Sequence, residues 1–410
     1  METNGFSTKI LHTSYLKKDI HHALHMPIYS NAAFEFDNAE QMEQAFLGKQ
    51  PDHVYSRISN PTVENLEQKI RMITGALSVT ALSSGMAAIS NVFFTFAEAG
   101  DNVISSKHLF GNSYSFLNST IKSFGIETKF CDLTDVNDIE KNIDGNTKAI
   151  FFETITNPQL EVVDIHQLSV IAKKHNLILI ADSTITPFNI FKAKEFGVNI
   201  EVISATKIIS GGATSIGGVI VDYGNFNWEH IKKLEPLAKK FGHHAFHAKL
   251  RKEIFRNIGA CLSPFHAYLQ SIGLETLELR YLKAALNCKQ TAEFLNQQKE
   301  VIHVNYPGIP DSRFYDISKK QFGEWPGAVL TFDLKSKLAC FDFLNKLTII
   351  RRATNLYDNK TLIMHPASTI FCEYSNDIRE DLGIPDTLIR LSLGIEDVND
   401  LIGDIKNALR

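Results

Sequence analysis

One complete strand–helix–strand unit stands out in the sequence: KAIFFETITNPQLEVVDIHQLSVIAKKHNLILIADST, residues 148–184. Two short apolar runs, 148–153 and 177–182, have the length and composition of buried strands. Between them, Asp164 to His175 predicts a helix, because a D-x-x-Q capping box precedes apolar residues at helical spacing. A strand, a helix and a second strand in this order are typical of a parallel sheet covered by helices.

The same alternation extends on both sides of this unit. Helical patterns separate seven short apolar runs, at 79–82, 103–106, 126–131, 148–153, 177–182, 200–205 and 216–221. We therefore expect an α/β fold with a large, mostly parallel sheet. In such a sheet, functional groups collect in the loops at the carboxyl ends of the strands.

The length of the chain indicates two domains. Its 410 residues exceed the roughly 250 to 300 at which one hydrophobic core stops growing. We expect residues 1–60 to form an extended arm rather than a packed helix, since they lack a sustained period. Residues 61–260 are expected to form the large domain, and residues 261–410 a smaller α/β domain.

Residues typical of helix ends support these divisions. Asn60 can cap a helix that has Pro61 at its first position and Gly75 just past its end. After Pro264 a long amphipathic helical run begins, and a last helix is predicted from Asp397.

Composition and charge argue against several classes of protein. Apolar residues make up 44% of the chain and charged residues 21%, as in ordinary globular proteins. A net charge of −4 gives no general attraction for nucleic acid or an anionic membrane, so we expect a small-molecule partner. The five cysteines form no C-x-x-C pair, and no segment has the apolar length of a signal peptide or a membrane span. We therefore expect a cytoplasmic protein.

Three other patterns in the sequence resemble a metal site, a nucleic-acid cleft and a dinucleotide site. The histidines at 21, 22 and 25 and at 243, 244 and 247 have no acidic or thiol partners, so no metal site is expected. The basic, aromatic stretch from Lys239 to Arg256 is expected to be a solvated or subunit-facing surface rather than a nucleic-acid cleft. The glycines at 211, 212, 217 and 218 do not form G-x-G-x-x-G, which argues against a dinucleotide-dependent oxidoreductase.

Four short motifs follow predicted strands of the large domain: S-S-G-M at 83–86, T-N-P at 156–158, A-D-S-T at 181–184 and S-A-T-K at 204–207. Each alone is typical of a turn, a helix cap or a solvated lysine. Together they predict a site for a phosphorylated ligand. The turn Ser84-Gly85-Met86 opens a helix whose free N–H groups can hold a phosphate, and Ser204 and Thr206 add hydroxyl donors.

The remaining residues of these motifs indicate that the ligand is a phosphorylated pyridine. Asp182 can keep a pyridine nitrogen protonated, and Asn157 can hydrogen-bond a ring hydroxyl. Lys207 can bond covalently to an aldehyde if burial and neighbouring charge lower the pKa of its amine. This combination predicts pyridoxal phosphate as the cofactor.

Five motifs carry a family resemblance, in order along nearly the whole chain: YSRISNPT at 55–62, SSGMAA from Ser83, ETITNP at 153–158, SATKIISGG at 204–212 and LIRLSLGIED at 388–397. They resemble the pyridoxal-phosphate-dependent Cys/Met metabolism enzymes. The resemblance implies the aspartate-aminotransferase fold type I, with a pyridoxal-phosphate-binding large domain and a substrate-binding second domain. It also implies a homotetramer of tight dimers that complete one another's active sites.

The same resemblance assigns further residues. Tyr55 and Arg57 match the pair that reaches the phosphate in the neighbouring subunit. Arg390 matches the arginine that binds the substrate α-carboxylate, which suits the fork of a guanidinium. Phe110 occupies the position of the aromatic ring that stacks on the cofactor, and Lys207 that of the catalytic lysine.

A second group of motifs, at 251–260, 263–269, 273–280 and 353–369, resembles the homoserine-ester sulfhydrylases more than the lyases. Asn355 would then hold the substrate carboxylate together with Arg390. The implied reaction replaces the acetate of O-acetylhomoserine with sulfur to give homocysteine for methionine biosynthesis. Free sulfide or a protein thiocarboxylate on a sulfur carrier could supply the sulfur. Alternatives left open are an O-succinylhomoserine sulfhydrylase, a γ-lyase, a cystathionine γ-synthase and a catalytically silent cofactor-binding protein.

Two residues depart from the family pattern. Most members have tyrosine at the position of Phe110, where its hydroxyl assists a leaving thiolate. Acetate is a stable anion and needs little such help, so Phe110 favours ester substrates. Gly212 stands where a histidine is usual, and the sequence offers no physical reason for it.

Overall fold

The computed structural model describes residues 5–13 and 19–410. A seven-stranded sheet forms its centre, with strand order β1-β7-β6-β5-β4-β2-β3. All neighbouring pairs are parallel except those that involve β7. The strands are β1 (Ser78–Leu82), β2 (Asn102–Ser105), β3 (Glu127–Phe130), β4 (Thr147–Glu153), β5 (Ile178–Asp182), β6 (Ile200–Ile203) and β7 (Gly218–Asp222). The predicted α/β class and the predominantly parallel sheet are confirmed.

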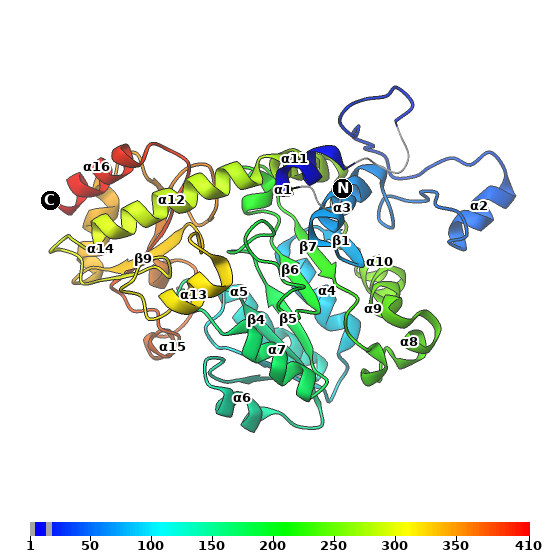
Figure 1. Cartoon of the computed structure of the whole chain (residues 1–410), viewed down its shortest axis with the longest axis horizontal. Helices are drawn as coiled ribbons and strands as arrows, with labels where there is room; N and C mark the ends of the chain where they lie inside the picture. Colours follow the sequence, from blue (N-terminus) through cyan, green and yellow to red (C-terminus); the bar gives the residue numbers. More distant parts are fainter. Residues whose placement is uncertain (1–4, 14–18) are drawn as a thin grey trace.

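Both faces of the inner strands of this sheet are buried, as expected for parallel strands, whereas the edge strand β3 is only partly covered. Alternate residues of β4 face opposite cores: Phe151 packs in the cluster that contains α4 (Gly85–Phe96), and Phe152 in the cluster that contains α3 (Pro61–Thr74). Figure 1 shows the central strands between the helices, with α7 (Ile165–Lys174) alongside β5. The apolar runs of the sequence therefore form the middle layer of the domain.

The predicted helix signals are present in the structure. The Asn60 side chain accepts a hydrogen bond from the N–H of Thr62, and Gly75 ends α3 with a φ of 63°. The Asp164 side chain accepts from the N–H of Gln167 at the start of α7. Local capping chemistry thus sets the ends of these helices.

The basic, aromatic stretch before residue 262 folds into short helices on the α4 side of the sheet. Trp228 and Phe246 are buried there, and their rings stack with centroids 4.9 Å apart. The helices of this region and the remaining short elements of the large domain are α5 (Gly111–Ser115), α6 (Val136–Asn142), α8 (Glu235–Phe241), α9 (Ala245–Lys249) and α10 (Phe255–Ile258).

The N-terminal region differs from the expected extended arm. Residues Phe6–His12 form α1, and Ile10 is only 1% exposed because the helix packs against α3 and α11 (Pro264–Glu275). Tertiary burial stabilises a helix that is too short to give a sequence period. The segment that begins at residue 19 does extend from the body and carries α2 (Ala39–Phe46), as Figure 1 shows. Residues 1–4 and 14–18 of the expected arm lie outside the described residues.

A long helix leads to the second domain. Whereas α11 packs against α3, the following α12 (Leu277–Leu295) reaches the second sheet (Figure 1). This sheet has the order β10-β11-β12-β9-β8. After α12, the helices and strands of the second domain are β8 (His303–Asn305), α13 (Tyr315–Phe322), β9 (Val329–Asp333), α14 (Lys337–Lys346), β10 (Arg351–Arg352), β11 (Leu362–Met364), α15 (Asn376–Asp381), β12 (Leu388–Ser392) and α16 (Val398–Leu409). Across the described ranges, no helix is both long enough and apolar enough to cross a bilayer.

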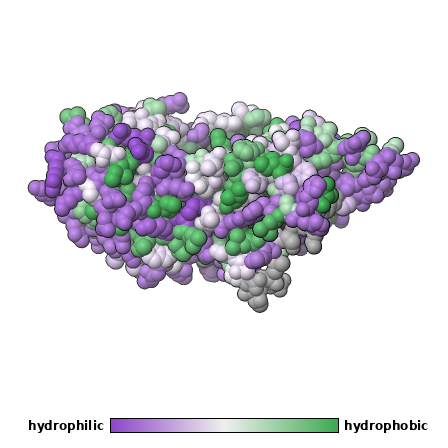
Figure 2. All heavy atoms as spheres, turned by 90° about the horizontal axis from the view of Figure 1, so that it is seen from above, coloured by the Kyte–Doolittle hydropathy of each residue, from purple (hydrophilic) through white to green (hydrophobic). Residues whose placement is uncertain are grey.

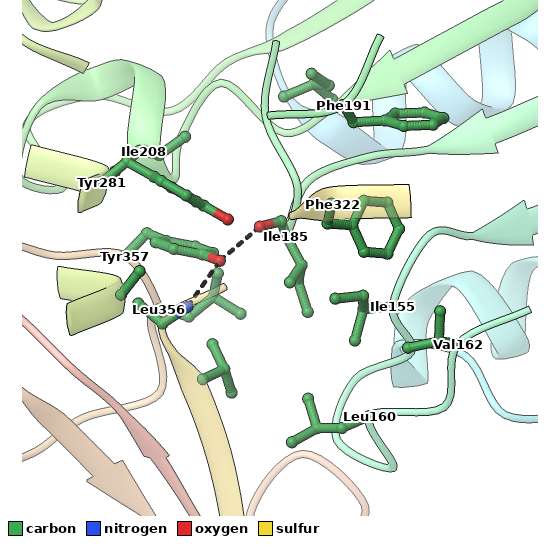
Figure 3. Close-up of a cluster of buried hydrophobic side chains, with 14 of the residues drawn as sticks. Ile155, Leu160, Val162, Ile185, Phe191, Ile208, Tyr281, Phe322, Leu356 and Tyr357 are labelled. Atoms are coloured by element: carbon green, nitrogen blue, oxygen red, sulfur yellow. Dashed lines mark hydrogen bonds between the residues drawn. The ribbon is translucent and has the colours of Figure 1, made fainter. Parts of the chain in front are cut away.

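A tyrosine ties the two domains together beside the site described below. Tyr357 lies in the loop between β10 and β11, and its hydroxyl donates to the carbonyl oxygen of Ile185, just after β5. Its ring stacks on Tyr281 of α12 with centroids 6.0 Å apart. Figure 3 shows both tyrosines beside Ile185 in the apolar core. This packing fixes the loop of Asn355 against the large sheet.

Candidate active site

A cavity of about 340 Å³ opens at the carboxyl ends of β1, β4, β5 and β6. It brings together the predicted site residues of both domains: Ser84, Gly85, Met86, Phe110, Asn157, Asp182, Ser204, Thr206, Lys207, Asn355 and Arg390. These residues are separated by up to about 300 positions in the sequence, and the topology of the sheets makes them neighbours.

One end of the cavity suits a phosphate. Ser84 caps α4, so the N–H groups of Gly85 and Met86 in the first turn have no acceptor within the helix. Glycine is required here, because a Cβ on Gly85 would lie 2.8 Å from the Cβ of Ser204. The Thr206 hydroxyl lies beside this turn and bonds to the backbone of Gly217. A helix N-terminus with two nearby hydroxyl groups fits the phosphate of the expected cofactor.

Two carboxyl groups lie side by side at the base of the cavity. Glu153 and Asp182 are register partners at the ends of β4 and β5. Asp182 accepts hydrogen bonds from the N–H (3.0 Å) and the hydroxyl (2.6 Å) of Thr184. Burial raises the pKa of Asp182, and the bonds from Thr184 oppose this effect. Burial and the charge of Asp182 raise the pKa of Glu153 well above its usual range.

The surroundings of the Lys207 amine lower its pKa. Lys207 follows β6, and its Nζ donates to Oδ1 of Asn355 at 2.6 Å. Burial, with a smaller effect from the charge of Arg390, lowers the pKa of Lys207 to about 8. A substantial fraction of this amine is therefore neutral and nucleophilic at mildly alkaline pH.

Arg390 is the second cation of the cavity and is only 2% exposed. Its Nη2 donates to the carbonyl oxygens of Thr354 (2.9 Å) and Asn355 (3.1 Å). Its Nη1 donates to Oδ1 of Asn157 at 3.1 Å, and its buried Nε has no protein acceptor. A rigidly held guanidinium with an unused donor fits a carboxylate ligand.

Phe110 and several aliphatic residues form the apolar wall. Phe110 precedes α5, and the following Gly111 packs closely on Ile370, since an added Cβ would lie 3.2 Å from the Ile370 carbonyl oxygen. The other apolar lining residues are Met86, Ile89, Ile155, Ile185, Leu356 and Ile370. The wall therefore presents no hydroxyl at the position of Phe110.

Sequence reasoning missed several of these lining residues. Glu153 and Thr184 lie inside quoted motifs, and an acid at the end of a buried strand was an available signal. The aliphatic residues gave no signal, because nothing in their local pattern separates them from the core.

Two predicted residues do not line the cavity of their own chain. Tyr55 and Arg57 are exposed, and the guanidinium of Arg57 lies 5.6 Å from the centre of the Tyr55 ring. Arg57 also donates to the carbonyl oxygen of Arg256. This pair lies on the outer surface of the chain, where a neighbouring subunit could reach it.

The structure explains Gly212. Its φ of 126° is rarely adopted by residues with a side chain, and a Cβ would lie 2.7 Å from Nδ2 of Asn359. That Nδ2 donates to the carbonyl oxygen of Gly211 at 3.0 Å. Asn359 thus occupies the space that a histidine side chain would need.

Comparison with known proteins gives a consistent result. The model of the family described as Cys/Met metabolism PLP-dependent enzyme matches residues 7–410. A crystal structure from Campylobacter jejuni, assigned as an O-acetylhomoserine (thiol)-lyase with a pyridoxyl-lysine monophosphate, is 33% identical over 99% of this chain and all of that one, with a TM-score of 0.94.

Two further proteins are similar over most of the chain. The structure of O-acetylhomoserine sulfhydrylase from the methionine biosynthetic pathway of Wolinella succinogenes is 47% identical, covers 86% of this chain and 97% of its own, and has a TM-score of 0.78. The L-methionine gamma-lyase of Fusobacterium nucleatum is 35% identical over all of this chain and 99% of its own.

Proposed function

Because the chain belongs to the PLP-dependent enzymes of Cys/Met metabolism, we propose that it is an O-acetylhomoserine sulfhydrylase. It exchanges the acetate of O-acetylhomoserine for sulfur and releases homocysteine in methionine biosynthesis. The observation that carries this proposal is the apolar Phe110 ring, which lines a cavity that otherwise holds the lysine, acid and arginine of the family.

One group of cavity residues would bind the cofactor. Pyridoxal phosphate supplies an electron sink that stabilises negative charge at the substrate α-carbon. Ser84, Gly85, Met86, Ser204 and Thr206 would hold its phosphate, Asp182 its pyridine nitrogen, and Asn157 its ring hydroxyl.

The substrate is oriented by the second domain. The Arg390 guanidinium binds the α-carboxylate together with the side chain of Asn355. Asn355 is held between the two cations, because its Oδ1 accepts from the Lys207 amine and its backbone carbonyl oxygen accepts from Arg390. Lys207 would take the proton from the α-carbon and deliver it to the bound cofactor, which restores a neutral amine. The amine would then take a proton from the β-carbon, so that acetate leaves from the γ-carbon. After sulfur adds at the γ-carbon, the same amine returns the protons.

The charges of the cavity favour acetyl over succinyl esters. Among the lining residues, Lys207 and Arg390 are the cations, and both have other roles in the proposed reaction. The distal carboxylate of a succinyl ester would find no further cation among the described residues that line the cavity, and burying an unpaired charge is unfavourable. The acetyl group instead fits the aliphatic wall.

A substrate panel tests the proposal. The purified holoenzyme is incubated with acetyl, succinyl and unesterified homoserine, each with sulfide, and homocysteine is measured. We expect the acetyl ester to give the highest kcat/KM. Faster use of the succinyl ester, or faster breakdown of methionine or cystathionine than of the acetyl ester, would assign the chain to one of the alternatives. The similarity to a gamma-lyase makes these thioethers the necessary comparison.

Phe110→Tyr is expected to leave turnover of the acetyl ester within about threefold of wild type and to raise the slow elimination from thioethers. The added hydroxyl places an acid near the γ-substituent, and a leaving thiolate gains more from an acid than acetate does. Ketoacid release from methionine and cystathionine measures the effect. Phe116→Tyr, a change of another phenylalanine outside the cavity, serves as the matched control.

The sulfur donor is proposed to be free sulfide or the thiocarboxylate of a small carrier protein. Steady-state rates with sulfide alone, compared with rates when a carrier thiocarboxylate is supplied, separate the two sources. A carrier is the donor if sulfide supports no turnover at any concentration at which the protein stays folded.

We propose a homotetramer of tight dimers in the cytoplasm. Figure 2 shows hydrophobic residues gathered over the middle of one face, where α1 and α11 lie in Figure 1. Exposed apolar residues of these helices include Leu11, Phe265 and Ile272. Such a patch is typical of a protein–protein interface. The proposed divisions are an N-terminal segment 1–60, in which α1 packs on the body and an arm follows it, the cofactor domain 61–260 and the substrate domain 261–410.

The proposed sharing of sites predicts complementation between subunits. Arg57→Ala and Lys207→Ala proteins should each be nearly inactive, because each lacks one part of every site. A mixed dimer collects both lesions in one site and leaves the other intact. Reassembled mixtures should therefore regain up to about a quarter of the wild-type rate per subunit. Activity no higher than the sum of the two variants, despite proven subunit exchange, would show that Arg57 does not serve a neighbour's phosphate.

A further inference from the structure

The carboxyl group of Glu153 connects two separate loops of the cavity. It lies at the end of β4 and is 6% exposed. Its Oε1 accepts a hydrogen bond from the N–H of Phe110 at 2.8 Å, and its Oε2 accepts from the N–H of Asn157 at 3.1 Å. Phe110 lies in the loop after β2, and Asn157 in the loop after β4. One side chain therefore anchors both loops by their backbones.

The anchored residues reach into the site. The Phe110 ring lines the cavity. Asn157 lines it as well, and its Oδ1 accepts from Nη1 of Arg390 at 3.1 Å. A continuous chain of contacts thus leads from Glu153 through Asn157 to the guanidinium of the second domain.

Fold stability alone does not account for an acid at this position. Glu153 lies beside Asp182 across the strand pair, and both are buried. Two adjacent buried carboxyl groups disfavour folding, because each resists ionisation of the other and neither is solvated. Such a pair is retained where its hydrogen bonds serve a site.

We propose that Glu153 is a positioning residue that holds Phe110 and Asn157, and through Asn157 the Arg390 guanidinium, in place around the cavity. Both of its oxygens already accept from backbone N–H groups, so it acts on the reaction through the residues that it holds. The inference rests on the proposed function only in that the cavity binds the cofactor and an amino-acid carboxylate.

Glu153→Gln in the full-length holoenzyme tests this proposal. The amide keeps the size of the side chain, but its NH₂ group can only donate, so one backbone N–H loses its acceptor and faces another donor. We expect kcat/KM for the amino-acid substrate to fall about 10- to 100-fold, mostly through a higher KM, because Arg390 is displaced. The circular dichroism of the cofactor's visible band should also change, since the Phe110 ring shifts.

Glu201→Gln is the matched control. Glu201 is fully buried on β6, but it bonds to the hydroxyl groups of Ser183 and Tyr223 and does not line the cavity. Hydroxyl groups can rotate to serve an amide, so this variant should keep its KM within about threefold and its dichroism unchanged.

The proposal is overturned if Glu153→Gln keeps the wild-type KM, cofactor affinity and dichroism. If that variant does not fold, Glu153→Asp replaces it, since its shorter side chain cannot reach both N–H groups.

Hydrogen exchange in the wild-type holoenzyme gives an independent measurement. The peptides that contain Phe110 or Asn157 should show slow exchange of these two amides. Rapid exchange of both amides would overturn the proposal. The dichroism and exchange measurements remain decisive even if the acetyl ester proves not to be the substrate.

Discussion

Lys207→Ala is expected to abolish turnover while the cofactor still binds. The half-buried amine is the group proposed to move protons at both the α- and β-carbons, so kcat should fall at least about 10³-fold. The phosphate contacts do not involve this side chain, so the holoenzyme should remain yellow. Turnover of the acetyl ester with sulfide measures the first effect. Mass spectrometry after borohydride reduction measures the covalent bond, which only the wild-type chain should show.

A matched variant separates this effect from general damage. Lys192 also donates to a backbone carbonyl oxygen, that of Phe188, but it is exposed and lies outside the cavity. Lys192→Ala should therefore keep turnover within a few-fold of wild type. If Lys207→Ala retains near-wild-type synthesis of homocysteine, the assignment of the catalytic lysine is wrong.

Arg390→Lys is expected to have the second largest effect. An ammonium group cannot reproduce the planar fork that bonds at once to Asn157, Thr354 and Asn355 and leaves a donor for the substrate. Losing one partner of a buried, charge-assisted pair costs about 2 to 5 kcal/mol, or roughly 30- to 5,000-fold in kcat/KM. We expect most of this loss in the KM for the amino-acid substrate.

The control for this change is a second buried arginine. Arg280 of α12 donates to the carbonyl oxygen of Gly273 and does not line the cavity. Arg280→Lys should lower the unfolding temperature without raising KM. An unchanged KM in Arg390→Lys would show that another group binds the carboxylate.

The outcome at the N-terminus shows where prediction from sequence fails. The helix Phe6–His12 forms because Ile10 is buried against α3 and α11, which lie far along the chain. No local pattern in seven residues outweighs the entropy of an isolated turn. Most strands of the large sheet, by contrast, were predictable, since they are runs of apolar residues bounded by turns. The edge strand β3 (Glu127–Phe130) is the exception, because three of its four residues are polar.

The site also contains residues that the sequence predicts and residues that only the folded structure brings into place. The sequence predicted Lys207, Asp182 and the phosphate-binding turn from their own chemistry, because their motifs follow strand ends. Arg390, which lies within β12, was predicted from the family resemblance alone. The sequence could not assign Glu153, whose role depends on backbone N–H groups from two loops that only folding brings within 3.1 Å of it.

Gly212 is the clearest case of a residue that only the tertiary structure explains. In the sequence it is a departure from a family pattern with no visible cause. In the structure, a φ of 126° strains any residue with a side chain, and the amide of Asn359, almost 150 residues later, lies where a Cβ would be placed. Local sequence determined which residues could perform the chemistry, because hydrogen-bonding capacity and strand or helix preference are properties of short segments. Packing between distant segments decided which residues meet, since contacts, burial and the resulting pKa values exist only once both domains have folded together.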